Sequence, residues 1–235
     1  MKILILTTQT IHHAYFVDEI RKIYPETVSF IETKTLSSAF EIAVEFETRR
    51  DEYEKELWYN GFEPQITDLT ETYVIRSIND KSVIEQIKRV KPDVTVVVGT
   101  GKLSKEVIET CGNIINLHGG NPEYYRGLDS HYWAIYHGDF KNLTVTLHLL
   151  NEILDDGNII QMGSILIQKD MELYQLRRFN VELCVKLVLS ALKSYETFSE
   201  FISRPQIKKG RYYSFMPACL KKISEKKFKQ YVANL

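Results

Sequence analysis

Cysteine is scarce in this chain, and its few copies stand far apart. Among 235 residues there are three, Cys111, Cys184 and Cys219. An odd number at wide spacing gives neither the paired framework of a disulfide-stapled domain nor the clustered ligands of a zinc site. We therefore expect no disulfide and no metal, and we expect each cysteine to be a small buried residue.

The chain also lacks a bias toward one sign of charge. It has 30 lysines and arginines against 31 aspartates and glutamates, which gives a formal net charge of −1. This balance argues against a protein that binds nucleic acid by bulk electrostatic attraction. A local basic patch remains compatible with it.

Long apolar runs are missing as well. The apolar run at residues 3–6 follows a single lysine and is too short for the core of a signal peptide. No other stretch approaches the length of a membrane-spanning helix. We expect a cytoplasmic protein that has no membrane partner.

Glycine is missing where the common nucleotide-binding loops need it. Residues 7–13 read Thr-Thr-Gln-Thr-Ile-His-His and contain no Gly-x-Gly-x-x-Gly fingerprint. Residues 98–102, Val-Gly-Thr-Gly-Lys, suggest a phosphate loop, but Val96 and Leu103 stand where that loop needs glycine and a hydroxyl residue. Two interpretations stay open for 98–102: a glycine turn between a strand and a helix, or a loop that binds another ligand.

Two adjacent histidines, His12 and His13, lie where the first predicted helix begins. Neither has an acidic or thiol partner at ligand spacing, so the sequence does not indicate a metal site there. We expect both to face a site from the loop that follows the first strand.

Apolar segments of alternating type predict an α/β fold. A strand, a helix and a second strand open the chain as a βαβ unit, which indicates a parallel sheet. We expect a Rossmann-like, mostly parallel sheet flanked by helices, with a catalytic domain over 1–200 and a short carboxy-terminal extension over 201–235. The expected strands are 1–7, 27–32, 93–98, 113–117, 143–150, a pair or one bent strand over 159–167, and 210–215; the expected helices are 14–23, 40–58, 83–90, 104–110, 130–137, 171–198 and 220–231.

In three of these ranges the pattern of apolar and polar residues also predicts which faces of the element are buried. The β-branched run at 93–98 is typical of a strand covered on both faces. The range 143–150 is expected to be an alternating strand. Residues 40–58 are strongly charged with one apolar stripe, which indicates a solvated helix and not a basic arm for nucleic acid.

The most informative residues lie between 116 and 155. Asn116 and His118 are two residues apart, so they share a face at the end of a predicted strand, and Asp155 follows the next strand. An asparagine amide can donate to a developing oxyanion, a histidine titrates near physiological pH, and an aspartate can hold charge or protons. These three residue types suit acyl transfer. Whether His118 takes a proton or polarises a carbonyl stays open.

Three motifs in this region resemble the signature of the folate-dependent formyltransferase family. They are Asn116-Leu117-His118, Tyr125-Arg126-Gly127 and Asp155-Asp156-Gly157, and the similarity extends from about residue 93 to 161. Many members of that family have serine or proline two residues after the histidine, whereas Gly119-Gly120 follows His118 here. The backbone is therefore more flexible at that point and offers no hydroxyl.

The resemblance implies a formyl donor, 10-formyltetrahydrofolate, and assigns residues to it. By similarity, Asn116, His118 and Asp155 are the catalytic residues. The residues implied to bind folate are Gly99, Thr100, Gly101, Lys102, Leu103, Asp155 and Gly157, and those implied to bind the acceptor are His12, His13, Lys102, Tyr125 and Arg126.

Comparison with three branches of the family favours a sugar N-formyltransferase. The branch that acts on tRNA has a further carboxy-terminal domain and a basic character, and the purine branch has a glycine-rich phosphate loop after its first strand; neither feature is found here. The expected acceptor is a nucleotide-linked amino sugar for surface polysaccharide, with dTDP-4-amino-4,6-dideoxyglucose as the best candidate. A glycinamide ribonucleotide transformylase and a non-catalytic folate-binding homologue are the alternatives. Apolar positions on 171–198 or the tail would suit a homodimer.

Overall fold

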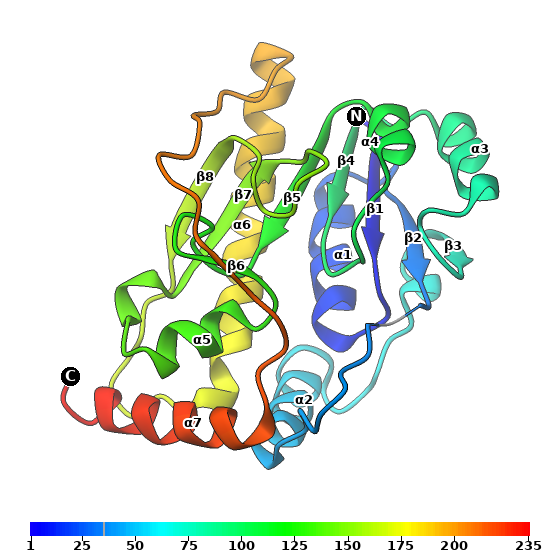
Figure 1. The fold of residues 1–235 in the computed structure, drawn as a ribbon. Helices are drawn as coiled ribbons and strands as arrows, with labels where there is room; N and C mark the ends of the chain where they lie inside the picture. The colour runs from blue at the N-terminus through cyan, green and yellow to red at the C-terminus, as the bar shows by residue number, and fades with distance from the viewer. Residues whose placement is uncertain (35) are drawn as a thin grey trace.

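A seven-stranded sheet forms the centre of the molecule (Figure 1). The computed structural model describes residues 1–34 and 36–235, and within them the strand order is β3-β2-β1-β4-β5-β7-β8. The strands from β3 to β5 pair in parallel, whereas β7 is antiparallel to β5 and to β8, so the predicted mostly parallel sheet is confirmed. The strands are β1 (Ile3–Thr7), β2 (Val28–Glu32), β3 (Glu71–Ile75), β4 (Val94–Val97), β5 (Ile114–His118), β7 (Thr144–Leu149) and β8 (Ile159–Ser164).

Helices cover both faces of this sheet. Alternate side chains of a strand point to opposite faces, and in β1 Ile3 and Ile5 pack with α1 and α6, whereas Leu4 and Leu6 pack with α3 and α4. Every residue of β4 is buried, as its β-branched run predicts. The helices are α1 (Ile11–Ile23), α2 (Glu45–Tyr59), α3 (Lys81–Val90), α4 (Lys105–Cys111), α5 (Ser130–Tyr136), α6 (Leu176–Phe198) and α7 (Ala218–Val232).

Two helices begin later than predicted. The helix expected from residue 40 begins at Glu45, because Val44 is extended and two glutamates, Glu45 and Glu47, occupy the first turn, where the helix dipole favours them. The helix expected from residue 171 begins at Leu176. A 3₁₀ turn, Leu173–Gln175, precedes it and carries a capping box. Charge and apolar content alone did not locate either start.

Two further predictions differ from the structure, and one strand was missed. Strand β7 is buried along most of its length because α6 and the loop after β5 cover its two faces, so the one-sided alternation expected for 143–150 is wrong. Strand β3 was not predicted because it lies at the sheet edge, where most of its side chains are partly or fully exposed. Cys219 is exposed on α7, whereas Cys111 and Cys184 are buried as expected.

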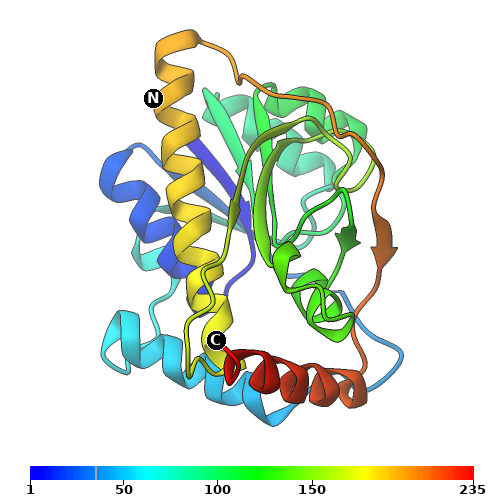
Figure 2. The same cartoon turned by 90° about the vertical axis from the view of Figure 1, so that its left-hand side faces the viewer.

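The carboxy-terminal segment crosses back over the sheet, as Figure 2 shows. After α6 the chain runs to β9 (Arg211–Tyr213), which pairs in parallel with β6 (Tyr125–Gly127). It then enters α7, which packs against α5 through Phe228 and Val232. This segment therefore contacts the loop that follows His118.

The sheet has a topological switch point between β1 and β4. Strand β1 pairs with β2 on one side and with β4 on the other, so the connections leave in opposite directions. In open parallel sheets, ligands bind beyond the carboxyl ends of the strands at such a point. The loops after β1 and β4, and the neighbouring end of β5, are therefore the place to look for a site. In the described part of the chain, no helix has the length and apolar character needed to cross a membrane.

Candidate active site

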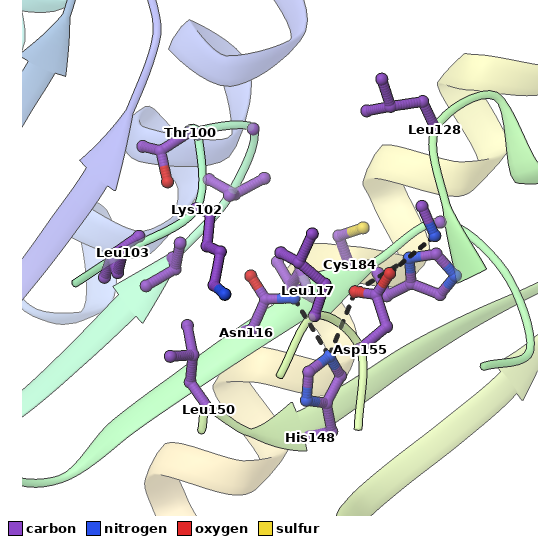
Figure 3. A pocket seen from close by; sticks show the side chains of 18 of the residues that line it. Thr100, Lys102, Leu103, Asn116, Leu117, Leu128, His148, Leu150, Asp155 and Cys184 are labelled. Carbon is purple, nitrogen blue, oxygen red and sulfur yellow. Dashed lines mark hydrogen bonds and ion pairs between the residues drawn. The ribbon is translucent and has the colours of Figure 1, made fainter. Parts of the chain in front are cut away.

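A cavity of about 510 Å³ lies at this edge of the sheet. Figure 3 shows Asn116, His148 and Asp155 meeting on one side of it, with Lys102 and Leu103 on the opposite side. The predicted site residues that line it are His12, His13, Gly99, Thr100, Gly101, Lys102, Leu103, Asn116, His118 and Asp155. Segments far apart in the sequence are thus brought together as expected.

Three predicted site residues lie outside this lining. Tyr125 is buried, and its hydroxyl donates to Asp139 over 3.0 Å. Arg126 is also buried, and its guanidinium donates to the carbonyl of Leu154. A Cβ atom added to Gly157 would lie 1.6 Å from the Leu149 carbonyl oxygen, so this glycine is needed for backbone packing.

Asn116 is oriented by a histidine that the sequence did not single out. Its side-chain nitrogen lies 3.0 Å from Nε2 of His148 on the neighbouring strand β7, where the two residues are register partners. Nδ1 of His148 lies 2.8 Å from the Leu149 carbonyl, which can only accept, so Nδ1 carries a hydrogen. In the neutral ring Nε2 is then the acceptor, and the amide of Asn116 donates to it.

No motif pointed to His148, because a lone histidine within an apolar strand is typical of a satisfied core residue. It is 2% exposed. Only the pairing of β5 with β7, which places it opposite Asn116, distinguishes it.

Asp155 lies between the two histidines. Its Oδ1 is 3.4 Å from Nδ1 of His118 and 3.7 Å from Nε2 of His148, and its Oδ2 accepts from the backbone N–H of Gly127 over 2.8 Å. Burial alone would raise the pKa of this carboxyl, but nearby His118 and His148, together with the hydrogen bond from the backbone N–H of Gly127, favour the charged form, outweigh burial and hold the pKa well below its usual range. Asp155 is therefore a carboxylate at neutral pH.

His118 has only one nitrogen free for proton exchange. Its Nε2 lies 2.7 Å from the Tyr125 carbonyl oxygen, so Nε2 carries a hydrogen that it donates. Nδ1 faces Asp155. Any proton that this ring gains or loses therefore moves at Nδ1, next to a carboxylate.

The loop after β4 is held by a buried carboxylate. Glu32, 5% exposed, accepts from the N–H of Gly101 over 2.9 Å and from the N–H of Ile78 over 3.0 Å. Gly99 has φ +76°, and a Cβ atom there would lie 2.3 Å from the ring of His13. Glycine is thus required at 99, and the loop presents its backbone to the cavity in one fixed form.

The histidine pair after β1 is neutral in this setting. Burial lowers the pKa of His13 to about 4, against the opposing effect of its contact with the Thr8 carbonyl. Burial also lowers the pKa of His12 well below its usual value, with a further contribution from the charge of Arg177. Both rings line the cavity as uncharged groups.

A second cavity of about 320 Å³ adjoins the first. Asn180 and Arg177 line both, and Arg50 lines the second. Arg177 is fixed by Glu54, which is fully buried, through bonds of 2.8 and 3.0 Å from its Nε. The side-chain oxygen of Asn180 is buried and has no partner among the described residues. Where the two cavities meet, the protein therefore presents the fixed guanidinium of Arg177 and the side-chain oxygen of Asn180, which can accept a hydrogen bond.

Comparison with known proteins agrees with this geometry. A family model described as formyl transferase matches residues 41–191, well over half of the chain. The chain belongs to the formyl transferase family. The match includes Asn116, His118 and Asp155, and it ends before the segment that carries β9 and α7.

A curated relative, methionyl-tRNA formyltransferase of Campylobacter jejuni, is 32% identical over 120 residues, which are 51% of this chain and 39% of that protein's own length. The chain thus spans about two fifths of this relative. A solved sugar N-formyltransferase from a Shewanella species superposes with a TM-score of 0.60 at 13% identity, over 97% of this chain and 88% of that one. An N-formyltransferase from Helicobacter canadensis superposes with a TM-score of 0.56 at 15% identity, over 91% and 71%. These two likenesses show a shared fold.

Proposed function

We propose that this protein transfers a formyl group from 10-formyltetrahydrofolate to the amino group of a nucleotide-linked amino sugar. The observation that carries the proposal is the convergence of Asn116, His118, His148 and Asp155 at the end of the cavity, within a chain of the formyl transferase family. A protein that only binds folate would not need these four side chains to converge.

The arrangement supports formyl transfer by a direct attack. An amine that attacks a formyl carbon places negative charge on the carbonyl oxygen and positive charge on nitrogen. Asn116 has a second amide N–H with no partner among the described residues, which is free to donate to that oxygen. A preorganised donor of this kind is worth about 3 kcal/mol of barrier. Nδ1 of His118 and the Asp155 carboxylate can accept the proton that the amine loses, and the carboxylate can stabilise the positive charge on nitrogen.

The cavity walls support the assignment of the donor. The backbone of residues 99–103 forms one wall, and its fixed amides and carbonyls suit the flat, hydrogen-bonding pterin ring. Leu103 and Leu150 add an apolar surface next to it. The Helicobacter canadensis neighbour was solved with folinic acid and dTDP-3-aminofucose, which supports a folate and a nucleotide sugar as the pair to test.

The acceptor is proposed to enter from the side of the second cavity. Arg177 and Asn180 stand at the border of both cavities, so a sugar placed there would reach the formyl group with its amine. Nε and Nη2 of Arg177 are held by Glu54 and Asp51, and Nη1, which has no hydrogen-bond partner among the described residues, suits a phosphate oxygen. Lys102 stands across the first cavity as a second cation.

Formyl transfer to purified acceptors tests the proposal. The protein is incubated with 10-formyltetrahydrofolate and, in separate reactions, dTDP-4-amino-4,6-dideoxyglucose, glycinamide ribonucleotide and methionyl-tRNA, and the formylated products are measured by mass spectrometry. We expect product with the nucleotide sugar, and formation about a hundredfold or more slower with the Asn116→Ala variant. Product only with glycinamide ribonucleotide would place the protein in the purine branch.

Methionyl-tRNA is the second candidate acceptor, because curated relatives act on it by name. Formylation of the tRNA at a higher kcat/KM than of every sugar tested would establish it. If tetrahydrofolates stabilise the protein in a thermal-shift experiment but no acceptor is formylated, a folate-binding role replaces both enzymes.

The proposal also covers the setting of the enzyme. We propose a homodimer in the cytoplasm that serves surface-polysaccharide synthesis. Phe198 at the end of α6 and Ile202 after it are more than half exposed, which supports an interface there. Light scattering after gel filtration measures the mass in solution, and a monomeric mass at micromolar concentration would refute the dimer.

A further inference from the structure

The segment 204–216, here called the strap, fastens together the two loops that hold the catalytic residues. Arg204 exchanges backbone hydrogen bonds of 2.8 and 2.9 Å with Ile159 at the start of β8, and its guanidinium pairs with Glu123 over 2.9 Å. Further on, β9 pairs with β6, and the N–H of Met216 donates to Asp129 over 2.8 Å. The strap therefore links the loop after His118 with the turn that carries Asp155.

Gln206 is the strap residue that reaches the turn of Asp155. Its side-chain Nε2 donates to the carbonyl of Asp155 over 2.9 Å and to the carbonyl of Gly157 over 3.0 Å. Each hydrogen of the amide thus meets one carbonyl of the same tight turn. The other end of the amide, Oε1, is buried and has no partner among the described residues, so the contact with the turn is what fixes this side chain.

The turn itself needs such a support. Asp155 has φ +52°, a left-handed conformation that costs a residue with a side chain on the order of 1 kcal/mol. Arg126 holds the same turn from the other side through the Leu154 carbonyl. With the turn in place, Oδ1 of Asp155 lies within 4 Å of both His118 and His148. A relaxed turn would move this carboxylate away from both rings.

We infer that Gln206 is a positioning residue, which sets the distance of the Asp155 carboxylate from His118 and His148 through the two backbone carbonyls. The strap lies outside the residues 41–191 that the family model matches, so this support belongs to the chain's own carboxy-terminal segment. The kinetic part of the inference rests on the proposed function; the placement of the carboxylate does not.

The test combines kinetics with a measurement on Asp155 itself. Gln206→Met keeps the size of the side chain and removes both donors. We expect kcat to fall on the order of tenfold with KM for the formyl donor changed less than twofold, because misplacement of a catalytic group lowers the rate more than binding. Lys208→Met is the matched control, since Lys208 lies on the same strap, its ammonium lies over the Tyr124 ring, and it has no hydrogen bond or ion pair to the turn of Asp155 among the described residues.

Carbon-13 NMR of a sample labelled at the aspartate carboxyls follows Asp155 directly, with Asp155→Asn assigning its signal. The groups that face this carboxylate are His118 from β5, His148 from β7 and the N–H of Gly127 from β6. In Gln206→Met the carboxylate moves away from them, so burial is opposed less strongly and its titration midpoint should rise, while Lys208→Met leaves it unchanged.

The outcomes separate the two proposals. If wild-type protein formylates none of the acceptors and the midpoint still rises in Gln206→Met, the proposed function fails and the positioning role stands. An unchanged midpoint in folded Gln206→Met overturns the inference, whatever the activity. If Gln206→Met does not fold, Gln206→Asn, which is one methylene shorter, is measured in its place and must show the same shift.

Discussion

At the scale of single residues, the site depends on which nitrogen of each imidazole carries a hydrogen. His118 donates from Nε2 to a carbonyl and His148 donates from Nδ1 to another, so main-chain groups on two strands fix both tautomers. The consequence is a division of roles. His148 can orient Asn116, while His118 can exchange protons only beside Asp155.

This division predicts unequal losses of activity. Asn116→Ala, His118→Asn and Asp155→Asn should each lower kcat by about a hundredfold or more, as loss of an oxyanion donor or an acid/base group does. His148→Phe should lower it by on the order of tenfold, because Asn116 remains but loses its orientation. Turnover of purified, folded variants is the measurement, with the exposed His137→Asn as control. Turnover near wild type in all three variants of the first group would refute the mechanism.

Arg126 carries a second prediction at this scale. A buried arginine at this position could contact the acceptor's phosphate, or it could form an ion pair with Asp129 or Glu123 and only shape the loop. Within the described part of the chain Arg126 forms neither ion pair: Arg204 pairs with Glu123, and Lys221 lies 3.8 Å from Asp129. Arg126 instead lies 3.9 Å from Asp156, with its guanidinium on the turn of Asp155.

Arg126→Lys therefore tests whether Arg126 also contacts phosphate. A lysine keeps the charge but cannot reproduce the planar contact with the turn, so we expect kcat to fall severalfold. Steady-state kinetics with the nucleotide sugar separates kcat from KM. Phosphate contact would raise KM as well, and an unchanged KM would exclude it.

At the scale of elements, the sequence was enough to predict the strands and loops next to the site. It was not enough to predict where α2 begins or the strand at the sheet edge. The strand that carries Asn116 and His118 was predictable because buried strands and a three-motif signature coincide there. The start of α2, the edge strand β3 and the role of Gln206 depend on contacts between distant segments, which one sequence does not contain. His148 falls in the same class, since only strand pairing reveals its partner.

The contact between α2 and α6 carries the prediction at this scale. Glu54 on α2 is fully buried and binds Arg177 on α6. Burial raises the pKa of this carboxyl, and Arg177 opposes that rise. Glu54→Ala would leave the guanidinium without this partner, which should lower the free energy of unfolding by about 3 kcal/mol. Urea unfolding at neutral pH measures the change.

The matched control for that experiment is Glu63→Ala. Glu63 is exposed just after α2 and lies 3.9 Å from Lys55, so its loss should change the free energy of unfolding by less than about 0.5 kcal/mol. Equal losses in the two variants would show that the buried pair does not join α2 to α6 in the way described.

At the scale of the whole molecule, the dependence of the rate on pH joins the site to the chemistry of the acceptor. A sugar amine must be neutral to attack, and most of it is protonated at pH 7, so the rate should rise with pH. The pKa of Asp155 lies well below its usual range. Asp155 is therefore ionised throughout the neutral region, and its own protonation would lower the rate only in strong acid.

We expect the profile to have an acidic limb that belongs to the coupled pair of His118 and Asp155, as one apparent value, and a later limb from the amine. Turnover against pH is measured for the wild type and for His118→Asn. If His118 accepts the proton at Nδ1, the variant loses the first limb and keeps the second, because the amine still has to lose its proton. If the first limb persists unchanged, Asp155 or a water that it holds takes the proton, and the charge of His118 serves the oxyanion.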